Sequence, residues 1–273
     1  MKKAIDTLVV SNLLFILLLS LAGSFSGVLG ELLYYLSFAL PVTLALLLWS
    51  KKEKGLFSRA CSAFGIKREN VLFTLPLVMP AVAIIFLAAY VTSLALGAFG
   101  FEGSTVESAS LFEMLFRHAF LPSVCEELLF RLLPFIILAP ISKKGAVLIS
   151  SLLFAFAHCN LFQIPYAFIA GFIFMVIDIA CESILPSLLL HFINNAVSVF
   201  WIKYCTDFNS ALAFVIILAL LSILSIIPVI VKRRAYSTRF LAVTEKGAEW
   251  KREAYSIVIF CIFTLAAAIL NLL

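Results

Sequence analysis

The sequence contains few charged residues. Only 13% of its 273 residues are Asp, Glu, Lys or Arg, whereas 64% are hydrophobic, and the mean hydropathy is +1.15. A soluble globular domain is roughly 25% charged and 45–50% apolar. Because no water-soluble core could bury so much apolar surface, the composition excludes a soluble protein and predicts an integral membrane protein.

The sequence also lacks short alternating strands, repeats of fixed period, low-complexity tracts and paired cysteines. Its apolar residues form long continuous runs, which favours spanning helices over barrel strands, because a helix satisfies its own backbone hydrogen bonds. The cysteines have no paired spacing and fall mostly inside these runs. We therefore expect small packing residues in a reduced setting, not a disulfide framework.

About nine apolar runs approach the ~20 residues that a spanning helix needs. They are residues 7–28, 31–49, 71–97, 114–139, 145–161, 164–181, 183–203, 210–231 and 254–272. We predict an all-α polytopic membrane protein, a single transmembrane domain over residues 1–273 with a bundle of about eight to nine transmembrane helices. The first run follows Lys2 and Lys3 as a signal peptide would, but its length predicts an uncleaved anchor.

Basic residues occupy alternate loops. They lie before the first run, and between the second and third, the fourth and fifth, and the eighth and ninth runs, whereas the opposite loops hold Glu102, Glu107 and Glu113. The positive-inside rule therefore predicts a cytoplasmic N-terminus. This placement assigns the net charge of +5 to orientation and anionic lipid, and excludes nucleic acid as a partner. The mixed segments 55–70 and 235–253 are predicted to be interfacial helices.

Three charges interrupt the fourth run, in the stretch "CEELLFRLLPF". A charge near the bilayer centre costs roughly 2.5–3.5 kcal/mol even on lenient scales, so function is the default explanation. Glu127 and Arg131 are four residues apart in the favourable order, which predicts an ion pair on one helix face. Glu126 is rotated by about 100° and lacks that partner. It is thus available as a general base or as a proton relay.

Two histidines and an asparagine are the other expensive polar groups near membrane depth. His158 lies late in the fifth run, and His191 lies in the seventh run with Asn195 one helical turn later. One shared site between three helices would explain all of them. A Glu and a His can hold and deprotonate a water, while a His and an Asn can stabilise an oxyanion. Glu126 and the histidines could instead hold zinc, although an amide such as Asn195 is a poor zinc ligand.

Other polar residues receive structural interpretations. His118 is expected at the interface, and Asp178 and Glu182 are expected to face headgroups at the end of the sixth run. Asn194 is expected to lie off the His191 face, which leaves Asn195 as the better oxyanion donor. Cys125 is rotated off the Glu126 face, so a cysteine nucleophile is not favoured.

The polar residues form three ordered motifs, one in each of three runs: Glu126-Glu127-x-x-x-Arg131, Phe154-x-x-x-His158 and His191-x-x-x-Asn195. This set resembles the CAAX-protease and bacteriocin-processing family, also called the type II CAAX prenyl endopeptidase or Abi family. The resemblance covers a catalytic core of about residues 110–205. It implies a multi-span intramembrane endopeptidase of a bacterial plasma membrane.

The resemblance also implies roles for the residues. Glu126 would activate water with His158 helping to hold it, His191 and Asn195 would form the oxyanion hole, and Glu127 and Arg131 would orient the site. The family is now read as glutamate proteases without a metal cofactor, although older descriptions call them metalloproteases.

The resemblance also implies the partners of the protein and the side of the membrane to which its site opens. The expected partners are the lipid bilayer and a membrane-associated protein or peptide substrate, which in eukaryotic members is prenylated. An opening toward the cytoplasm is expected. The alternative function is a non-catalytic scaffold or a bacteriocin self-immunity protein, which would bind peptide without cleaving it.

Overall fold

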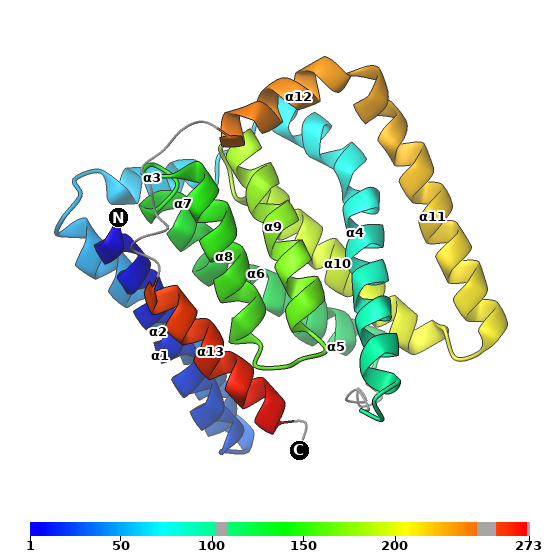
Figure 1. Ribbon diagram of the computed structural model, residues 1–273, viewed down its shortest axis with the longest axis horizontal. Helices are drawn as coiled ribbons and strands as arrows, with labels where there is room; N and C mark the ends of the chain where they lie inside the picture. The colour runs from blue at the N-terminus through cyan, green and yellow to red at the C-terminus, as the bar shows by residue number, and fades with distance from the viewer. Residues whose placement is uncertain (102–108, 245–254, 272–273) are drawn as a thin grey trace.

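The fold is helical throughout the part of the chain that can be described. The computed structural model describes residues 1–101, 109–244 and 255–271, and these contain no β-strand (Figure 1). Glu102, Glu107 and residues 245–253, on which parts of the loop predictions rest, lie outside the described residues. The predicted all-α polytopic fold is confirmed.

Six helices of the described chain are long and apolar enough to cross a membrane by themselves, and they coincide with six of the predicted runs. They are α1 (Lys2–Gly23), α2 (Gly27–Ser50), α4 (Arg68–Gly97), α9 (Ile164–Cys181), α10 (Leu185–Tyr204) and α11 (Phe208–Val231). The protein is therefore an integral, multi-pass membrane protein.

The other three predicted spans are helical but differ from simple 20-residue helices. The fifth and ninth become α8 (Lys143–Ala157) and α13 (Tyr255–Leu270), which have 15 and 16 residues. The fourth is an unbroken series of short segments: α5 (Leu111–Met114), η1 (Leu115–Phe120), α6 (Leu121–Glu127), η2 (Leu128–Leu132) and α7 (Leu133–Ile137). All nine predicted runs are thus helical where the structure describes them, six as long helices and three as shorter or segmented ones, because hydropathy does not report where a helix narrows, widens or stops.

Prolines account for the two π-helical segments, η1 and η2, of this series. Pro122 and Pro134 stand at the second residue of α6 and α7, directly after them. A proline ring clashes with the carbonyl four residues earlier and offers it no N–H. The carbonyl of Phe130, four residues before Pro134, accepts instead from the Ser150 hydroxyl of α8 at 2.6 Å and from Arg131 Nη1 at 3.2 Å. The π-helical segment η2 is therefore hydrogen-bonded to α8.

Helices α8 and α9 occupy the middle of the bundle (Figure 1). Helices α1 and α2 pack side by side with α13 next to them, and α11 lies at the far edge against α4. The close approach of α8 and α9 depends on Gly171, where an added Cβ would lie 2.9 Å from the Cα of Ser151. Small residues allow such contacts between membrane helices.

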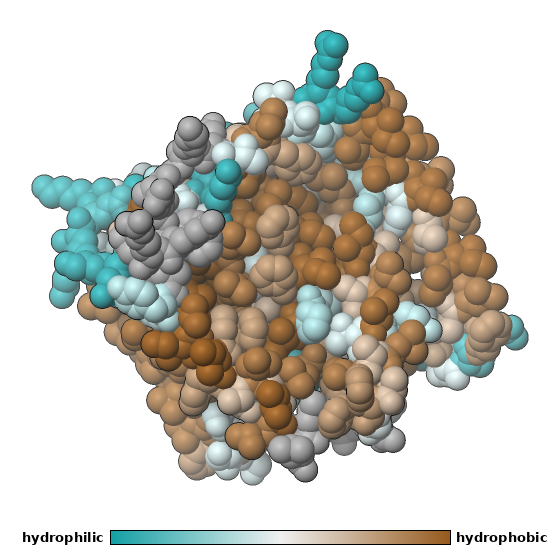
Figure 2. Space-filling view, in the orientation of Figure 1, coloured by the Kyte–Doolittle hydropathy of each residue, from teal (hydrophilic) through white to brown (hydrophobic). Residues whose placement is uncertain are grey.

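One end of the bundle collects the basic loops. The predicted interfacial segments contain the short helices α3 (Leu56–Ala63) and α12 (Arg233–Leu241), followed by η3 (Ala242–Thr244). Figure 2 shows hydrophilic side chains gathered at this end, while the flanks of the bundle are hydrophobic. We call this the basic end. All six cysteines are free, as predicted.

The α8–α9 contact generates a stability prediction. Gly171→Ala should lower the unfolding temperature of the detergent-solubilised protein, because the methyl group would press on the Ser151 backbone and overpacking typically costs about 1–3 kcal/mol. Gly97→Ala is the matched control, since an added Cβ there meets no atom within 4 Å. Equal thermal stability of the two variants would show that α8 and α9 separate without penalty.

Candidate active site

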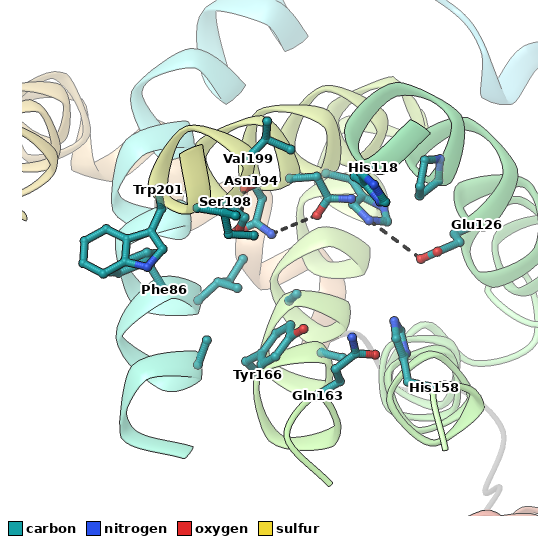
Figure 3. Close-up of a pocket in the computed structure, with 18 of the residues that line it drawn as sticks. Phe86, His118, Glu126, His158, Gln163, Tyr166, Asn194, Ser198, Val199 and Trp201 are labelled. Carbon is teal, nitrogen blue, oxygen red and sulfur yellow. Dashed lines mark hydrogen bonds and ion pairs between the residues drawn. The ribbon is translucent and has the colours of Figure 1, made fainter. Parts of the chain in front are cut away.

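A cavity of about 620 Å³ lies between α4, η1, α6, α8, α9 and α10 (Figure 3). Its lining includes Glu126, His158, His191 and Asn195. These side chains come from the fourth, fifth and seventh predicted spans. The structure therefore brings together the polar groups that the sequence predicted would share one site.

The predicted ion pair between Glu127 and Arg131 is present. Arg131 Nε lies 3.4 Å from Glu127 Oε2, and neither side chain has any exposed surface. The guanidinium lies over the ring of Phe154, at 4.4 Å, and near that of Phe174, at 5.5 Å. The Arg131 guanidinium is thus enclosed by the Glu127 carboxylate and by two aromatic ring faces, which attract a desolvated cation.

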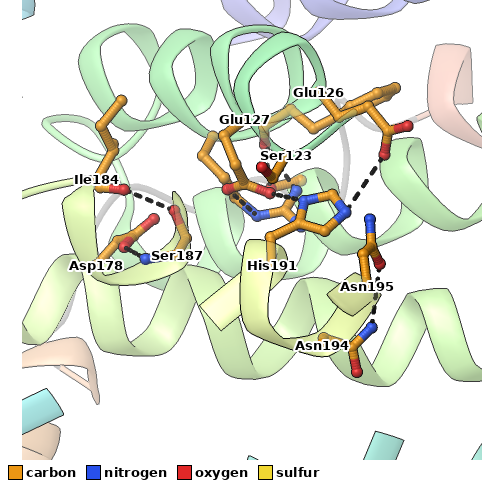
Figure 4. A network of polar contacts seen from close by, with 12 residues as sticks. Ser123, Glu126, Glu127, Asp178, Ile184, Ser187, His191, Asn194 and Asn195 are labelled. Carbon is orange, nitrogen blue, oxygen red and sulfur yellow. Dashed lines mark hydrogen bonds and ion pairs between the residues drawn. The ribbon is translucent and has the colours of Figure 1, made fainter. Parts of the chain in front are cut away.

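His191 lies between the two adjacent glutamates (Figure 4). Its Nδ1 is 2.7 Å from Glu127 Oε1, and its Nε2 is 3.8 Å from Glu126 Oε2. Glu126 is rotated away from Glu127, as expected, yet the two carboxylates approach opposite edges of the same ring. The sequence pattern predicted the pairing of Glu127 with Arg131 but not this bridge.

Neighbouring acceptors determine which nitrogen of each histidine carries hydrogen. Glu127, paired with Arg131, accepts from Nδ1–H of His191. The Nδ1 of His158 is 2.7 Å from the carbonyl of Phe154, which can only accept. In the neutral state each ring therefore keeps Nε2 as an acceptor. His191 can donate a hydrogen bond from Nε2 only when it is protonated.

The Asn194 side chain also lines the cavity, contrary to expectation. Its Nδ2 donates to Asn195 Oδ1 at 3.3 Å. This contact occupies the oxygen of Asn195, and Figure 4 shows the amide nitrogen of Asn195 turned toward His191 and Glu126. The interaction orients Asn195 with its donor toward the cavity.

Asp178 was predicted wrongly as a headgroup-facing residue, and sequence reasoning missed its position. It is completely buried, and its Oδ1 accepts from the backbone N–H of Ser187, one turn before His191, at 2.9 Å. The chain reverses at Glu182, which has a left-handed backbone (φ 52°), so Asp178 points at the start of α10. Of these two acidic residues, Glu182 is the exposed one, and its Oε2 lies 3.7 Å from Lys67 Nζ. An acidic residue ahead of a turn and a new helix was the available signal, because carboxylates favour helix N-termini.

His118, which was expected at the interface, is exposed and also lines the cavity. It lies in η1, where the π-helical turn changes the register that an α-helical count assumes. With Tyr90 and Ser93 it forms an exposed edge of the cavity. These residues come from the parts of η1 and α4 that lie away from the basic end. The exposed edge of the cavity is therefore remote from the basic loops. The expected opening toward the cytoplasm stays a prediction.

The zinc alternative can be compared with the side-chain geometry. In the part of the chain that the structure describes, no three His, Cys, Asp or Glu side chains are grouped so that they could hold a metal ion. Glu126, His158 and His191 share the cavity, but they do not form the compact three-ligand set of a catalytic zinc site.

The segment that forms most of this cavity matches a known protein family. Residues 108–197 match the family model described as Type II CAAX prenyl endopeptidase Rce1-like. No curated protein and no solved structure gives a match. The matched segment contains all six predicted site residues, and the family resemblance inferred from the motifs is confirmed. The match supports an intramembrane protease of the CAAX type.

The buried ion pair generates a second stability prediction. Arg131→Met should destabilise the protein by about 3–5 kcal/mol, because it leaves Glu127 buried without its counter-charge. The double variant Glu127→Gln/Arg131→Met should recover part of this loss in thermal unfolding. Arg117→Met is the control, since that arginine is 58% exposed and its pair with Glu113 is worth under about 1 kcal/mol. If the double variant were no more stable than Arg131→Met, the stranded charge would not be the cause.

Proposed function

We propose that this chain is an intramembrane endopeptidase of the glutamic type, which hydrolyses a peptide bond of a membrane-associated protein or peptide. The observation that carries the proposal is the position of His191, bonded to one carboxylate and 3.8 Å from a second at the wall of a cavity. A structural polar cluster would need only the Glu127–Arg131 pair. The carboxylate of Glu126 is not needed for that pair, and it can serve as a general base.

The proposed nucleophile is a water held between Glu126 and His158. The Nε2 of His158 accepts one hydrogen bond from this water, and the Glu126 carboxylate accepts the other. As the water oxygen attacks the carbonyl carbon of the substrate, its proton passes to Glu126. A tetrahedral intermediate with a negatively charged oxygen results.

Asn195 is the proposed donor to this oxyanion. Its Nδ2 is directed into the cavity because Asn194 occupies its oxygen. His191 becomes the second donor when it is protonated at Nε2, and Glu127 stabilises the resulting imidazolium through Nδ1–H. The role that the motif suggested for His191 thus requires the charged ring.

The intermediate then collapses. The C–N bond breaks, and the leaving nitrogen takes the proton from Glu126, which returns to the carboxylate form. The products are one chain ending in a carboxylate and one beginning with an amine. Glu127 and Arg131 touch no reacting atom in this scheme and act as positioning residues for His191.

Glu126→Gln should abolish cleavage while the protein remains folded, since a general base contributes about 10²–10⁴ in rate. The measurement is comparative membrane proteomics for precursors that accumulate uncut. Glu113→Gln is the control, because Glu113 lies at the exposed start of the same helical series. Identical proteomes of the wild type and Glu126→Gln, with function retained, would favour the scaffold or self-immunity alternative.

Asn195→Ala should lower kcat by about 10²–10³, as loss of one oxyanion donor does elsewhere, with KM little changed. Asn194→Ala should have a smaller effect in the same direction, because it only releases the amide of Asn195. Ser198→Ala is the control: this side chain lines the cavity but bonds to its own helix at Asn194 O. A raised KM with unchanged kcat in Asn195→Ala would assign Asn195 to substrate binding.

Active, purified enzyme should contain far less than one zinc per chain, and a strong chelator should leave its activity unchanged. The metal content is measured by elemental mass spectrometry alongside the cleavage rate. Loss of activity on chelation that zinc alone restores would overturn the proposed mechanism in favour of a His₂Glu site.

A further inference from the structure

A second cavity, of about 510 Å³, lies at the basic end of the bundle. The ends of α3, α4, α8, α9 and α12 surround it, whereas the candidate active site lies toward the other end. Its lining holds four cationic and two acidic side chains, which are Arg59, Lys67, Lys143, Arg239, Glu69 and Glu182. The cations come from four separate segments, so the fold, rather than a single basic stretch, creates the concentration of positive charge.

Arg239 is held in place by neutral partners. Its guanidinium lies over the ring of Phe73 at 4.8 Å, and its Nη1 donates to Asn70 Oδ1 at 2.9 Å. Asn70 is itself fixed, since its Nδ2 donates to the carbonyl of Cys181 at 2.6 Å. These contacts orient Arg239 without cancelling its charge. A guanidinium has five N–H donors in a planar fork, which suits two oxygens of a phosphate.

Arg59 and Lys67 differ from Arg239 in having acidic partners. Arg59 donates to the carbonyl of Ile136 at 2.8 Å and to Glu53 at 2.6 Å, and this hydrogen bond lowers the pKa of Glu53 below its ordinary value. Arg59 therefore helps to shape the cavity wall. Lys67 and Glu182 form an open surface pair at 3.7 Å, which a stronger anion could replace.

The other wall of the cavity is apolar. It is formed by Phe135, Ala139, Pro140 and Ile179, which lie at the ends of the helical series before α8 and of α9. A soluble anion needs no such surface, whereas a lipid presents its phosphate directly above a hydrocarbon chain. Basic pockets between membrane helices are a known form of headgroup site.

We infer that this cavity binds the headgroup phosphate of an anionic phospholipid from the leaflet at the basic end. Arg239 presents its guanidinium to the phosphate, and Lys67 releases Glu182 and binds the phosphate instead. Lys143 adds positive charge at the lining, and the apolar wall receives the first carbons of the acyl chains. None of the residues that line this cavity takes part in the proposed hydrolysis.

The test uses the purified full-length chain in detergent, titrated with phosphatidylglycerol and with phosphatidylcholine of the same acyl chains. Bound lipid is counted by native mass spectrometry. Lys67→Gln/Lys143→Gln/Arg239→Gln removes three charges from the cavity. Lys232→Gln/Arg233→Gln/Arg234→Gln removes three charges from the same end, at and just before the start of α12, outside the lining.

We expect the wild type to prefer phosphatidylglycerol, the cavity variant to bind it at least about tenfold more weakly, and the control variant to differ by less than about twofold. Equal losses in both variants would attribute binding to the general surface charge and overturn the inference. Displacement of the lipid by millimolar inorganic phosphate would identify a soluble-anion site instead. If the cavity variant does not fold, the wild type still decides, because equal affinity for the two lipids contradicts the inference.

Discussion

A buried ion pair inside a membrane bundle is the interaction on which the rest of this structure depends. Glu127 and Arg131 have no exposed surface, and Arg131 Nε approaches Glu127 Oε2 at 3.4 Å without hydrogen-bond geometry. Their attraction is therefore largely Coulombic, and in a low-dielectric interior it is strong only while both charges remain. Phe154 of α8, Phe174 of α9 and His191 of α10 must all converge on the pair, which explains why three motifs on different helices form one unit.

The second constraint is that every backbone carbonyl released in the membrane needs a donor. Pro134 releases the carbonyl of Phe130, and Ser150 and Arg131 supply the donors. The same arginine thus neutralises Glu127 and satisfies the backbone of its own helix. The contacts of Arg131 therefore link the irregular helix to the ion pair, and Glu127 links the ion pair to His191. The same contacts stabilise the fold and orient the candidate active site.

Local patterns in the sequence predicted the helical fold, most span positions and the convergence of Glu126, His158, His191 and Asn195. The helices and the Glu127–Arg131 pair could be predicted because apolar runs and four-residue spacings are properties of a single helix. The convergence could be predicted because separate polar groups at membrane depth are costly unless they share a site. The burial of Asp178 and the place of His118 in the cavity lining were not predicted, for the opposite reason. The position of Asp178 depends on a left-handed residue that turns the chain, and that of His118 on a π-helical turn, and neither changes hydropathy. The bridging of Glu126 and Glu127 by one ring required the packing of α10 against α6, which no pattern within either helix contains.

The π-helical segment η2 has a consequence for how this sequence can change over time. Such a segment corresponds to one extra residue in an α-helix, and an α-helix turns by about 100° per residue. Deleting one residue between Leu128 and Leu132 would leave the hydropathy and length of the span almost unaltered. It would nevertheless rotate Glu126 and Glu127 away from the part fastened to α8. Apolar substitutions can accumulate along this span between its polar residues and prolines, but insertions and deletions are restricted to the loops outside it.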